Sequence, residues 1–425
     1  MRIAITTLGC KINQFETDSI RYSLESKGGK IVPFDEEADV YVINTCSVTA
    51  KSDYQSRQTI RSAIRRNNSA KIVVTGCYAE IRPNEIREIQ GVNLVIGNRD
   101  KAVIADRILS SAISMEGQNE PLSVNIPLIS LRSRTRGFLK IQDGCDNRCS
   151  YCIVPLARGN SRSVHPQEVV KEFDRLVSSG YPEIVVTGIH VGTYGSDLGT
   201  GLTLTQMIRM LLSARGKTRI RLSSIEPNEI TDEIIGFLDN GLCRHLHVPL
   251  QSGDDKILAL MKRHYTSSFY HDLLEKISRR VPNIALGADI MVGFPGEGDK
   301  EFQNTLKLVE KLPLTHVHVF SYSPRPGTPA ADMKNQVPDV IKKERNEEIR
   351  NLGKKKNIIF RQRNIGMELV VVVEDKKDET SGLYTGLTDN YIRVQIVGAK
   401  KEHIGKTVSG VITEATEVAT VSNIL

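Results

Sequence analysis

Short apolar runs alternate with amphipathic stretches over the first quarter of the chain. The apolar runs predict strands at residues 3–7, 40–43, 72–75 and 94–96, and the amphipathic stretches predict helices after Asn13, Ala50, Pro83 and Asp100. Strands that alternate with helices form a parallel sheet, because each helix carries the chain back to the edge where the strand began. The pattern predicts an N-terminal α/β domain over residues 1–112, followed by a linker over 113–131.

A second alternation of strands and helices follows the linker. Predicted strands lie at residues 137–141, 183–186, 219–222, 245–250, 284–290 and 316–320, with helical segments between them. Repeated strand and helix units of this kind predict an α/β core with a partial TIM-like (β/α)6 barrel, in which chemistry takes place at the carboxyl ends of the strands. We assign this core to residues 132–363, whose last part is a basic connecting helix.

The last part of the chain, residues 364–425, changes to short β-rich runs at 368–374, 381–388, 391–395, 407–414 and 418–422. Short strands separated by turns predict a small β-barrel. Tyr391 and Arg393 alternate along one run, so a ring and a guanidinium on one face could bind an unpaired RNA base. The alternative is a core tyrosine beside a solvated arginine.

Composition places the chain among globular proteins with two or three domains. It has 425 residues, of which 40% are hydrophobic and 25% charged, and no apolar run is long enough to span a membrane. The N-terminus shows no secretion signal, and seven scattered cysteines argue against a disulfide-rich secreted scaffold. We expect a cytoplasmic protein that uses cysteines as metal ligands.

The net charge of +7 is concentrated in patches. Residues 341–364 contain nine Lys or Arg against three Glu, and Arg57, Arg61 and Arg65 share one face of a predicted helix. Clustered basic residues are typical of nucleic-acid binding, and the arginine stripe is a candidate phosphate contact. The alternative for each patch is a solvated helix surface.

Cys145, Cys149 and Cys152 have the spacing C-x3-C-x2-C. Three thiolates on one short loop can hold three irons of a 4Fe-4S cube, which leaves the fourth iron open to a substrate. A zinc knuckle or three structural cysteines are the alternatives. Zinc needs a fourth Cys or His nearby, and His165 lies outside the usual spacing. The spacing therefore predicts a cluster with an open iron.

Cys10, Cys46 and Cys77 come at the ends of three predicted strands of the N-terminal domain. The carboxyl ends of parallel strands meet at one edge of a sheet, so these cysteines are expected to converge and to hold a second 4Fe-4S cluster with an open iron. The alternative is three separate buried thiols. Gly9 and Gly76 favour the ligand interpretation, because glycine lets the backbone turn tightly around an inorganic group.

Other polar residues have weaker signals. His245 and His247 alternate on a predicted strand, and we expect core or structural roles for them rather than metal ligation. Cys243 is expected to be a buried small side chain. Arg158 and Arg162 follow the cysteine loop and could bind an anionic group or form salt bridges.

Nine stretches of the chain together resemble one family. They are TLGCKINQFETD, VINTCSVTAKSD, VTGCYAE, KIQDGCDNRCSYCIVPLARGNSRS, RLSSIEPNEI, HLHVPLQSG, IMVGFPGE, SYSPRPGTPA and TDNYIRV. On these motifs the chain resembles the radical S-adenosylmethionine (SAM) methylthiotransferases from end to end, and its last domain resembles the TRAM RNA-binding domain. The resemblance implies that a methylthio group is attached to an unactivated C–H carbon, with one SAM as methyl donor and another as the source of a deoxyadenosyl radical.

The resemblance also implies cofactors and site residues. The cofactors are SAM and two 4Fe-4S clusters, of which the SAM-binding one is held by Cys145, Cys149 and Cys152. The residues expected to contact SAM are Tyr151, Thr187, Gly188, His190, Ser224, Glu226, Gln251, Gly293 and Phe294. No catalytic side chain is expected beyond the clusters and the radical derived from SAM.

The first cysteine loop, GCKINQFETD, resembles the branch that acts on N6-threonylcarbamoyladenosine next to the anticodon of tRNA, at carbon 2 of adenine. Branches acting on isopentenyladenosine in tRNA or on a ribosomal-protein aspartate remain alternatives, as does a non-enzymatic iron–sulfur RNA-binding regulator. The expected partners of this monomeric chain are the tRNA anticodon stem-loop, a flavodoxin- or ferredoxin-like electron donor and a sulfur donor, with no membrane association.

Overall fold

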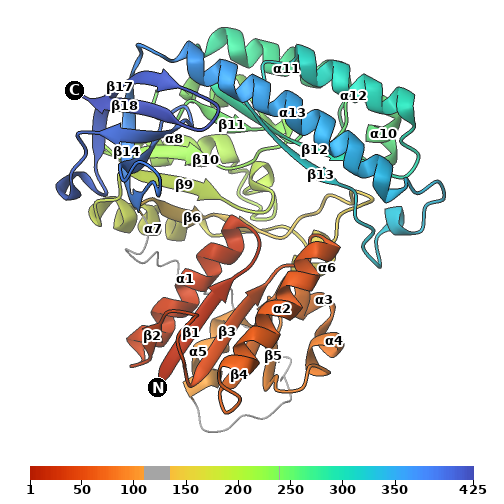
Figure 1. Cartoon of the computed structure of the whole chain (residues 1–425), viewed down its shortest axis with the longest axis vertical. Coiled ribbons are helices and arrows are strands. Elements are labelled where there is room, and N and C mark those ends of the chain that lie inside the picture. The colour runs from red at the N-terminus through yellow and green to blue at the C-terminus, as the bar shows by residue number, and fades with distance from the viewer. Residues whose placement is uncertain (110–134, 239) are drawn as a thin grey trace. The chain divides into compact units, whose positions relative to one another are not determined.

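The computed structural model of the chain describes residues 1–109, 135–238 and 240–425. It divides into two compact units, drawn together in Figure 1. The N-terminal unit contains the described residues of Met1–Leu131 together with Asp143–Arg162 and Ser323–Ala331. The barrel unit contains the described residues of Arg132–Gln142, Ser163–Tyr322 and Asp332–Leu425. The predicted linker over 113–131 lies outside the described residues.

The N-terminal unit is built on a parallel sheet with helices on both faces. Its strands are β1 (Arg2–Thr7), β2 (Lys30–Val32), β3 (Val40–Thr45), β4 (Lys71–Gly76) and β5 (Leu94–Ile96), in the order β2-β1-β3-β4-β5. Its helices are α1 (Lys11–Ser26), α2 (Ala50–Arg66), α3 (Cys77–Ile81), α4 (Pro83–Arg87) and α5 (Ile104–Leu109). The predicted α/β fold is confirmed, although the short edge strand β2 was not predicted.

The alternation of side chains along the central strands explains the two layers of helices. Ala4, Tyr41 and Ile43 face one hydrophobic cluster, and their neighbours Ile3 and Val42 face the other. All six residues of β3 are buried, as expected for a strand that is covered on both faces. The strand order reverses between β1 and β3, and ligands of such sheets bind beyond the carboxyl ends of the strands at that point.

The N-terminal unit also contains the predicted cluster loop. The short strands β7 (Gln142–Asp143) and β8 (Arg162–Ser163) lead into and out of this loop, and α6 (Val154–Arg158) follows its third cysteine. The separate segment Ser323–Ala331 belongs to the same unit, where the backbone N–H of Ala330 donates to the Ser150 carbonyl at 2.8 Å.

The barrel unit contains two parallel three-stranded sheets. One has the order β10-β9-β6, formed by β10 (Arg219–Leu222), β9 (Glu183–Thr187) and β6 (Gly137–Lys140). The other has the order β11-β12-β13, formed by β11 (His245–His247), β12 (Ala285–Val292) and β13 (His316–Ser321). Isolated parallel bridges pair Ile220 of β10 with Leu242, and Ser224 with His247 of β11, so the sheets continue one another.

The strands of the barrel unit alternate with helices, as predicted for a partial TIM-like barrel. The helices are α7 (Pro166–Ser178), α8 (Leu204–Ala214), α9 (Asp232–Phe237), α10 (Asp255–Leu260), α11 (Ser267–Arg280) and α12 (Asp299–Lys311). Both sheets and their helices share one hydrophobic cluster, to which Leu139, Val186, Leu246 and Ala288 belong. The predicted (β/α)6 arrangement is confirmed.

The C-terminal region is a helix followed by a closed β-barrel. The helix α13 (Asp339–Arg363) leads to β14 (Glu368–Lys377), β15 (Tyr384–Thr388), β16 (Arg393–Val397), β17 (Thr407–Ala415) and β18 (Thr420–Ile424), which close in the order β14-β15-β16-β18-β17. The predicted small barrel is confirmed. In the described part of the chain, no helix combines the length and the apolar character needed to cross a membrane.

Within the barrel unit, the C-terminal β-barrel packs against the residues that begin β10. Glu183 is completely buried and binds the guanidinium groups of Arg219 at 2.6 Å and Arg221 at 2.9 Å. These arginines also donate to main-chain carbonyls of the C-terminal barrel, Arg219 to Val370 at 2.8 Å and Arg221 to Thr388 at 3.0 Å. One buried carboxylate therefore orients two cations that hold the small barrel.

Candidate functional site

Cys10, Cys46 and Cys77 lie at one edge of the N-terminal sheet. Cys10 caps the start of α1, Cys46 directly follows β3, and Cys77 is the first residue of α3 after β4. The strands before them, β1, β3 and β4, are neighbours in the sheet. Gly9 has a φ of +100°, and a Cβ atom there would lie 2.8 Å from the Sγ of Cys46. A side chain at position 9 would therefore push the Cys10 loop away from Cys46.

The surroundings of this first triad fit a cationic metal group. Burial raises the pKa of the Cys46 thiol, the Val48 backbone lowers it, and the neighbouring Cys77 and Cys10 raise it further. A positive centre bound to the Cys46 sulfur would offset these effects, because a cation favours the thiolate. Two buried side-chain oxygens, Asn44 Oδ1 and Thr75 Oγ1, have no hydrogen-bond partner among the described residues, and each lies two residues before a cysteine of the triad.

The second triad is held in a closed loop. The backbone N–H of Cys145 donates to the Gly159 carbonyl at 3.1 Å, and that of Cys152 donates to the Cys149 carbonyl at 3.0 Å. Gly144 has a φ of +72°, and a Cβ there would lie 1.9 Å from the carbonyl oxygen of Asn160. The base of the loop therefore requires glycine at position 144. All three cysteines lie on this one closed loop, as the ligands of an inorganic cluster would.

Arg158 connects the two cysteine regions of the N-terminal unit. Its buried guanidinium donates to Glu16 Oε1 at 2.7 Å, to Asn13 Oδ1 at 2.7 Å and to Asp143 Oδ1 at 3.1 Å. Burial alone would lower the pKa of Arg158, but the charges of Glu16 and Asp143 hold it well above its usual range. Lys101, also buried, binds Glu16 as well. Of the two roles expected for Arg158, the structure supports the salt bridge.

A second buried arginine was not expected from the sequence. Arg325 binds Asp53 Oδ2 at 2.5 Å and Ser47 Oγ at 2.9 Å, and Ser47 also donates to Asp53 at 2.7 Å. Ser47 directly follows Cys46, so Arg325 supports the chain beside the first triad. The signal was its place in the motif SYSPRPGTPA, but its partners are more than 270 residues away in the sequence.

Tyr151 lies in the cysteine loop of the N-terminal unit, whereas the other residues expected to contact SAM lie at or just beyond the carboxyl ends of strands in the barrel unit. Some of these are already paired. His190 binds Glu229 at 2.5 Å, and Glu226 binds Arg263. Burial raises the pKa of Glu226, although Arg263 and His190 lower it. These contacts already engage the imidazole of His190 and the carboxylate of Glu226. Phe294, completely buried, packs edge-on against Tyr322 with ring centres 5.5 Å apart.

Gln251 is better placed to meet a ligand. It adopts a φ of +63°, unusual for a residue other than glycine, and this places its side chain in a buried position. The buried Oε1 atom of Gln251 has no hydrogen-bond partner among the described residues, and neither does the buried hydroxyl of Ser223. Strained backbone and unpaired buried polar atoms are typical of ligand sites. Thr187 is the last residue of β9, and Gly293 directly follows β12.

The side chains expected to bind RNA also make contacts with other side chains of this protein. Arg57 donates to Tyr78 Oη at 2.9 Å, and Arg57, Arg61 and Arg65 line a depression of about 480 Å³ together with Glu85 and Glu88. The acidic residues reduce the attraction of this stripe for phosphate.

In the C-terminal barrel, the ring of Tyr391 stacks on His245 with centres 4.0 Å apart, and Arg221 lies 5.1 Å from the ring centre. These contacts occupy the ring of Tyr391, which favours the core alternative for this residue. Arg393, 56% exposed, forms an ion pair with Glu374 at 2.6 Å.

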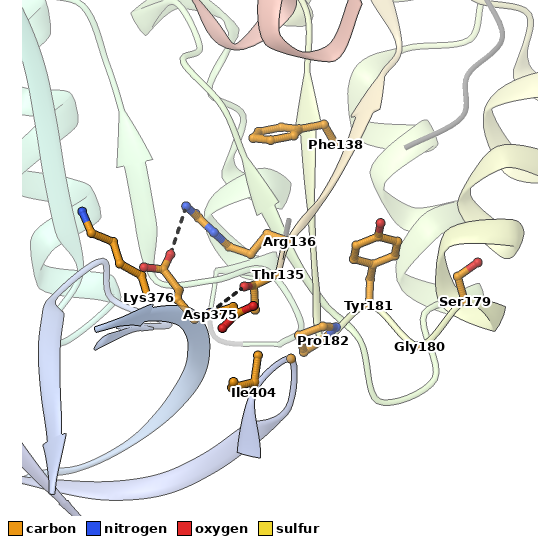
Figure 2. Close-up of a pocket in the computed structure, with 12 residues that line it drawn as sticks. Thr135, Arg136, Phe138, Ser179, Gly180, Tyr181, Pro182, Asp375, Lys376 and Ile404 are labelled. Atoms are coloured by element: carbon orange, nitrogen blue, oxygen red, sulfur yellow. Dashed lines mark hydrogen bonds and ion pairs between the residues drawn. The ribbon is translucent and has the colours of Figure 1, made fainter. Parts of the chain in front are cut away.

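A separate cavity of about 630 Å³ lies elsewhere in the barrel unit (Figure 2). Arg136 at its wall forms ion pairs with Glu183 at 3.4 Å and Glu374 at 3.6 Å. Figure 2 shows Tyr181 and Pro182 beside it, just before the start of β9. The cavity is therefore at the amino ends of the barrel strands, away from the carboxyl ends where chemistry is expected.

Family models and solved structures of known proteins match the barrel and the cysteine loop described above. Residues 139–309 match the model of the radical SAM superfamily, and residues 2–97 match an uncharacterized protein family, UPF0004. The radical SAM methyltransferase TsrM from Kitasatospora setae, solved with cobalamin and a 4Fe-4S cluster, has a similar fold, with a TM-score of 0.57, 16% identity and coverage of 78% of this chain and 74% of that chain. The fold and the C-x3-C-x2-C loop thus define a radical SAM enzyme.

Similar proteins of known name show which family of radical SAM enzymes the chain belongs to. The threonylcarbamoyladenosine tRNA methylthiotransferase MtaB of Bacillus subtilis (strain 168) is 39% identical, covering 97% of this chain and 94% of that protein. Its namesake in Thermotoga maritima is 38% identical over 93% of this chain and 91% of that protein. The tRNA-2-methylthio-N(6)-dimethylallyladenosine synthase of Clostridium tetani is 32% identical over 96% and 93%. The chain belongs to the radical SAM tRNA methylthiotransferase family, which uses SAM and 4Fe-4S clusters.

Proposed function

We propose that this chain is a tRNA methylthiotransferase that places a methylthio group on carbon 2 of N6-threonylcarbamoyladenosine, next to the anticodon. The observation that carries the proposal is the presence of two cysteine triads in one compact unit, one of them at adjacent strand ends. A radical SAM enzyme that does not insert sulfur needs only the triad on the loop, which here is Cys145, Cys149 and Cys152. The choice of nucleoside is supported by the higher identity to the threonylcarbamoyladenosine enzymes than to the dimethylallyladenosine enzymes named above.

The cysteines are the proposed ligands. Cys145, Cys149 and Cys152 would hold the SAM-binding cluster, and Cys10, Cys46 and Cys77 would hold the second one. When bound, the clusters and SAM supply the radical chemistry that activates a C–H carbon and the sulfur that it receives. The side chains around them position and shield these groups, and no acid or base is required.

The proposed SAM contacts are Tyr151, Thr187, Gly188, His190, Ser224, Glu226, Gln251, Gly293 and Phe294. Among them, the Gln251 amide is best supported, because its buried oxygen has no partner among the described residues. His190 is paired with Glu229 and Glu226 with Arg263, so these two residues would shape the wall of the SAM site.

The proposed partners follow from the same reaction. The tRNA anticodon stem-loop is the substrate, and a flavodoxin- or ferredoxin-like protein would supply electrons, with a further protein as sulfur donor. Arg57, Arg61, Arg65, Arg393 and α13 are the basic elements offered to RNA. We propose that the chain acts in the cytoplasm as a monomer. We also propose that its domains are residues 1–112, 132–363 and 364–425, with a linker at 113–131.

The two-cluster model has a direct chemical test. Iron and sulfide analysis after anaerobic reconstitution should find about eight irons per chain, and about four for Cys10→Ala. The variant should still cleave SAM but should no longer insert sulfur. Cys243→Ala removes a buried cysteine outside both triads and is the matched control, expected to behave as the natural protein. Four or fewer irons in the natural protein, or loss of SAM cleavage in Cys10→Ala, would overturn the model.

The substrate is tested in cells. Nucleosides of tRNA from a strain lacking the gene should contain threonylcarbamoyladenosine without its methylthio group, and expression of the natural chain should restore the group. Loss of the methylthio group from isopentenyladenosine instead would assign the chain to the other tRNA branch. Persistence of both methylthio nucleosides would reject a tRNA substrate.

A further inference from the structure

Three side chains converge on the sheet β11-β12-β13 of the barrel unit. His247 Nε2 lies 3.0 Å from Asp289 Oδ2, and His318 Nδ1 lies 3.5 Å from Asp289 Oδ1. Each histidine therefore faces a different oxygen of the same carboxylate. One potential ligand atom from each of the three residues lies within 4.8 Å of the other two.

The register of the strands explains this convergence. Asp289 is paired with His318 across β12 and β13, and His247 is paired with Gly287 across β11 and β12. A Cβ atom at Gly287 would lie 2.7 Å from His247 Nδ1. The glycine thus leaves space for the imidazole to lie across β12 and reach Asp289, two residues further along the strand.

The same face of the sheet also carries a second pair of histidines. Leu246 and Ala288 point into the hydrophobic cluster beneath the helices, so His245 and His247 point to the opposite face. His245 stacks on Tyr391, and His316 meets the same ring edge-on with centres 5.4 Å apart. The structural role expected for both histidines on β11 therefore fits His245.

His247 lies in a different environment. Its cluster opens to solvent, because the side chain of His318 is 66% exposed and that of Asp289 is 28% exposed. Its three members are two histidines and an aspartate, and no cysteine belongs to this group. A set of two imidazole nitrogens and one carboxylate oxygen is a common ligand set for divalent first-row metals.

We propose that His247, Asp289 and His318 form a binding site for one divalent transition-metal ion. Two ligand atoms that are each about 2.1 Å from one ion, at tetrahedral or octahedral angles, are about 3.0 to 3.4 Å apart. The His247–Asp289 distance of 3.0 Å lies within this range, and the His318–Asp289 distance of 3.5 Å lies just above it, within reach of a small side-chain rotation. The exposed side leaves coordination positions open to water or to an anionic group of a ligand.

The test uses Mn²⁺ and the holoprotein with its clusters oxidised, a state in which 4Fe-4S centres give no electron paramagnetic resonance signal. Bound Mn²⁺ loses the sharp six-line spectrum of the free ion, so the remaining signal measures binding. The natural protein should bind one Mn²⁺ more tightly than Asp289→Asn and His318→Ala do, by at least about tenfold. Zn²⁺ should displace the bound Mn²⁺ and restore the signal.

A matched control comes from the surface of the same unit. His271 and Asp272 form an exposed pair on α11 at 3.1 Å, and His271→Ala should bind Mn²⁺ as the natural protein does. Iron content is measured for every variant, to show that the clusters are unchanged. Because His318 is exposed, its substitution leaves the fold intact. Equal Mn²⁺ binding by the natural protein, Asp289→Asn and His318→Ala would overturn the proposal.

Discussion

Arg158 donates a hydrogen bond to Glu16 at 2.7 Å across 142 residues of sequence. Glu16 lies on the helix that begins after Cys10, and Arg158 lies on the helix that follows Cys152. Both side chains are buried, and Arg158 also binds Asp143, two residues before Cys145. The pairing therefore fixes the two cysteine regions relative to each other within one unit, as a reaction that uses both clusters requires.

Replacing Arg158 by Met should destabilise the N-terminal unit strongly. The change removes a buried cation that contacts both Glu16 and Asp143, and breaking a buried pair in this way costs about 3 to 5 kcal/mol. Urea unfolding of the holoprotein, followed by circular dichroism, measures the loss. Arg162→Met is the control, because Arg162 is only partly buried and its guanidinium donates to the Asn160 carbonyl rather than to a buried carboxylate. Equal unfolding curves for both variants would contradict the assignment.

Glu183→Gln should weaken the docking of the C-terminal β-barrel. The neutral amide cannot balance Arg219 and Arg221, and we expect a loss of about 3 to 5 kcal/mol. Limited proteolysis between α13 and β14, together with urea unfolding, measures the effect. The control is Glu233→Gln, whose partner Arg209 lies on the surface, with an expected loss of at most about 1 kcal/mol. An effect as small as that of the control would reject the docking role.

The same carboxylate gives a pH dependence with a defined sign. Burial alone would raise the pKa of Glu183, but Arg221 and Arg219 hold it well below its usual range. Its contribution to stability is therefore complete above about pH 4.3, the value in an unfolded chain, and is lost as the pH falls through the folded pKa. The stability difference between the natural protein and Glu183→Gln should be constant from pH 7 to 5 and should shrink below about pH 4. A stability difference that grows on acidification would contradict the lowered pKa of Glu183.

Local patterns in the sequence were sufficient for the strands, the helices and the C-x3-C-x2-C loop, because each depends on residues close together along the chain. The placement of Cys10, Cys46 and Cys77 at one sheet edge needed one further rule, that the carboxyl ends of parallel strands meet at the same edge. The pairing of Arg158 with Glu16 and of Arg325 with Asp53 was not predictable in this way, since the partners are 142 and 272 residues distant. Tyr391 shows a second limit. Its alternation with Arg393 is visible in the sequence, but whether the ring faces RNA or His245 depends on how two domains pack.

Gly9→Ala should reduce the iron content from about eight to about four per chain. The added methyl group would lie 2.7 Å from Cys46 Cβ and 2.8 Å from its Sγ, so it would displace a ligand of the first triad. Gly28→Ala is a matched control, since Gly28 has a φ of +88° but nothing within 4 Å of a Cβ. Both variants carry the backbone strain of a positive φ, and only the first carries the clash. Loss of iron in both would attribute the effect to strain alone.

Arg393 and Tyr391 should separate RNA binding from folding. Arg393→Ala removes an exposed cation whose ion pair with Glu374 contributes little to stability. If Arg393 contacts a phosphate, its loss should weaken tRNA binding and reduce the slope of log affinity against log salt by about one. Tyr391→Leu should instead lower stability by about 1 to 3 kcal/mol, because the ring packs on His245 and beneath Arg221.

Filter binding of tRNA at several salt concentrations, with urea unfolding of the same samples, measures both effects. Arg279→Ala is the control for charge, because Arg279 on α11 is 77% exposed and also pairs with a glutamate, Glu275. Both arginine variants lower the net charge by one, so a general electrostatic effect would change their salt slopes equally. A larger change for Arg393→Ala alone would place a phosphate contact on the C-terminal barrel. Equal slopes would leave the barrel with only the structural role that Tyr391 and Glu183 already give it.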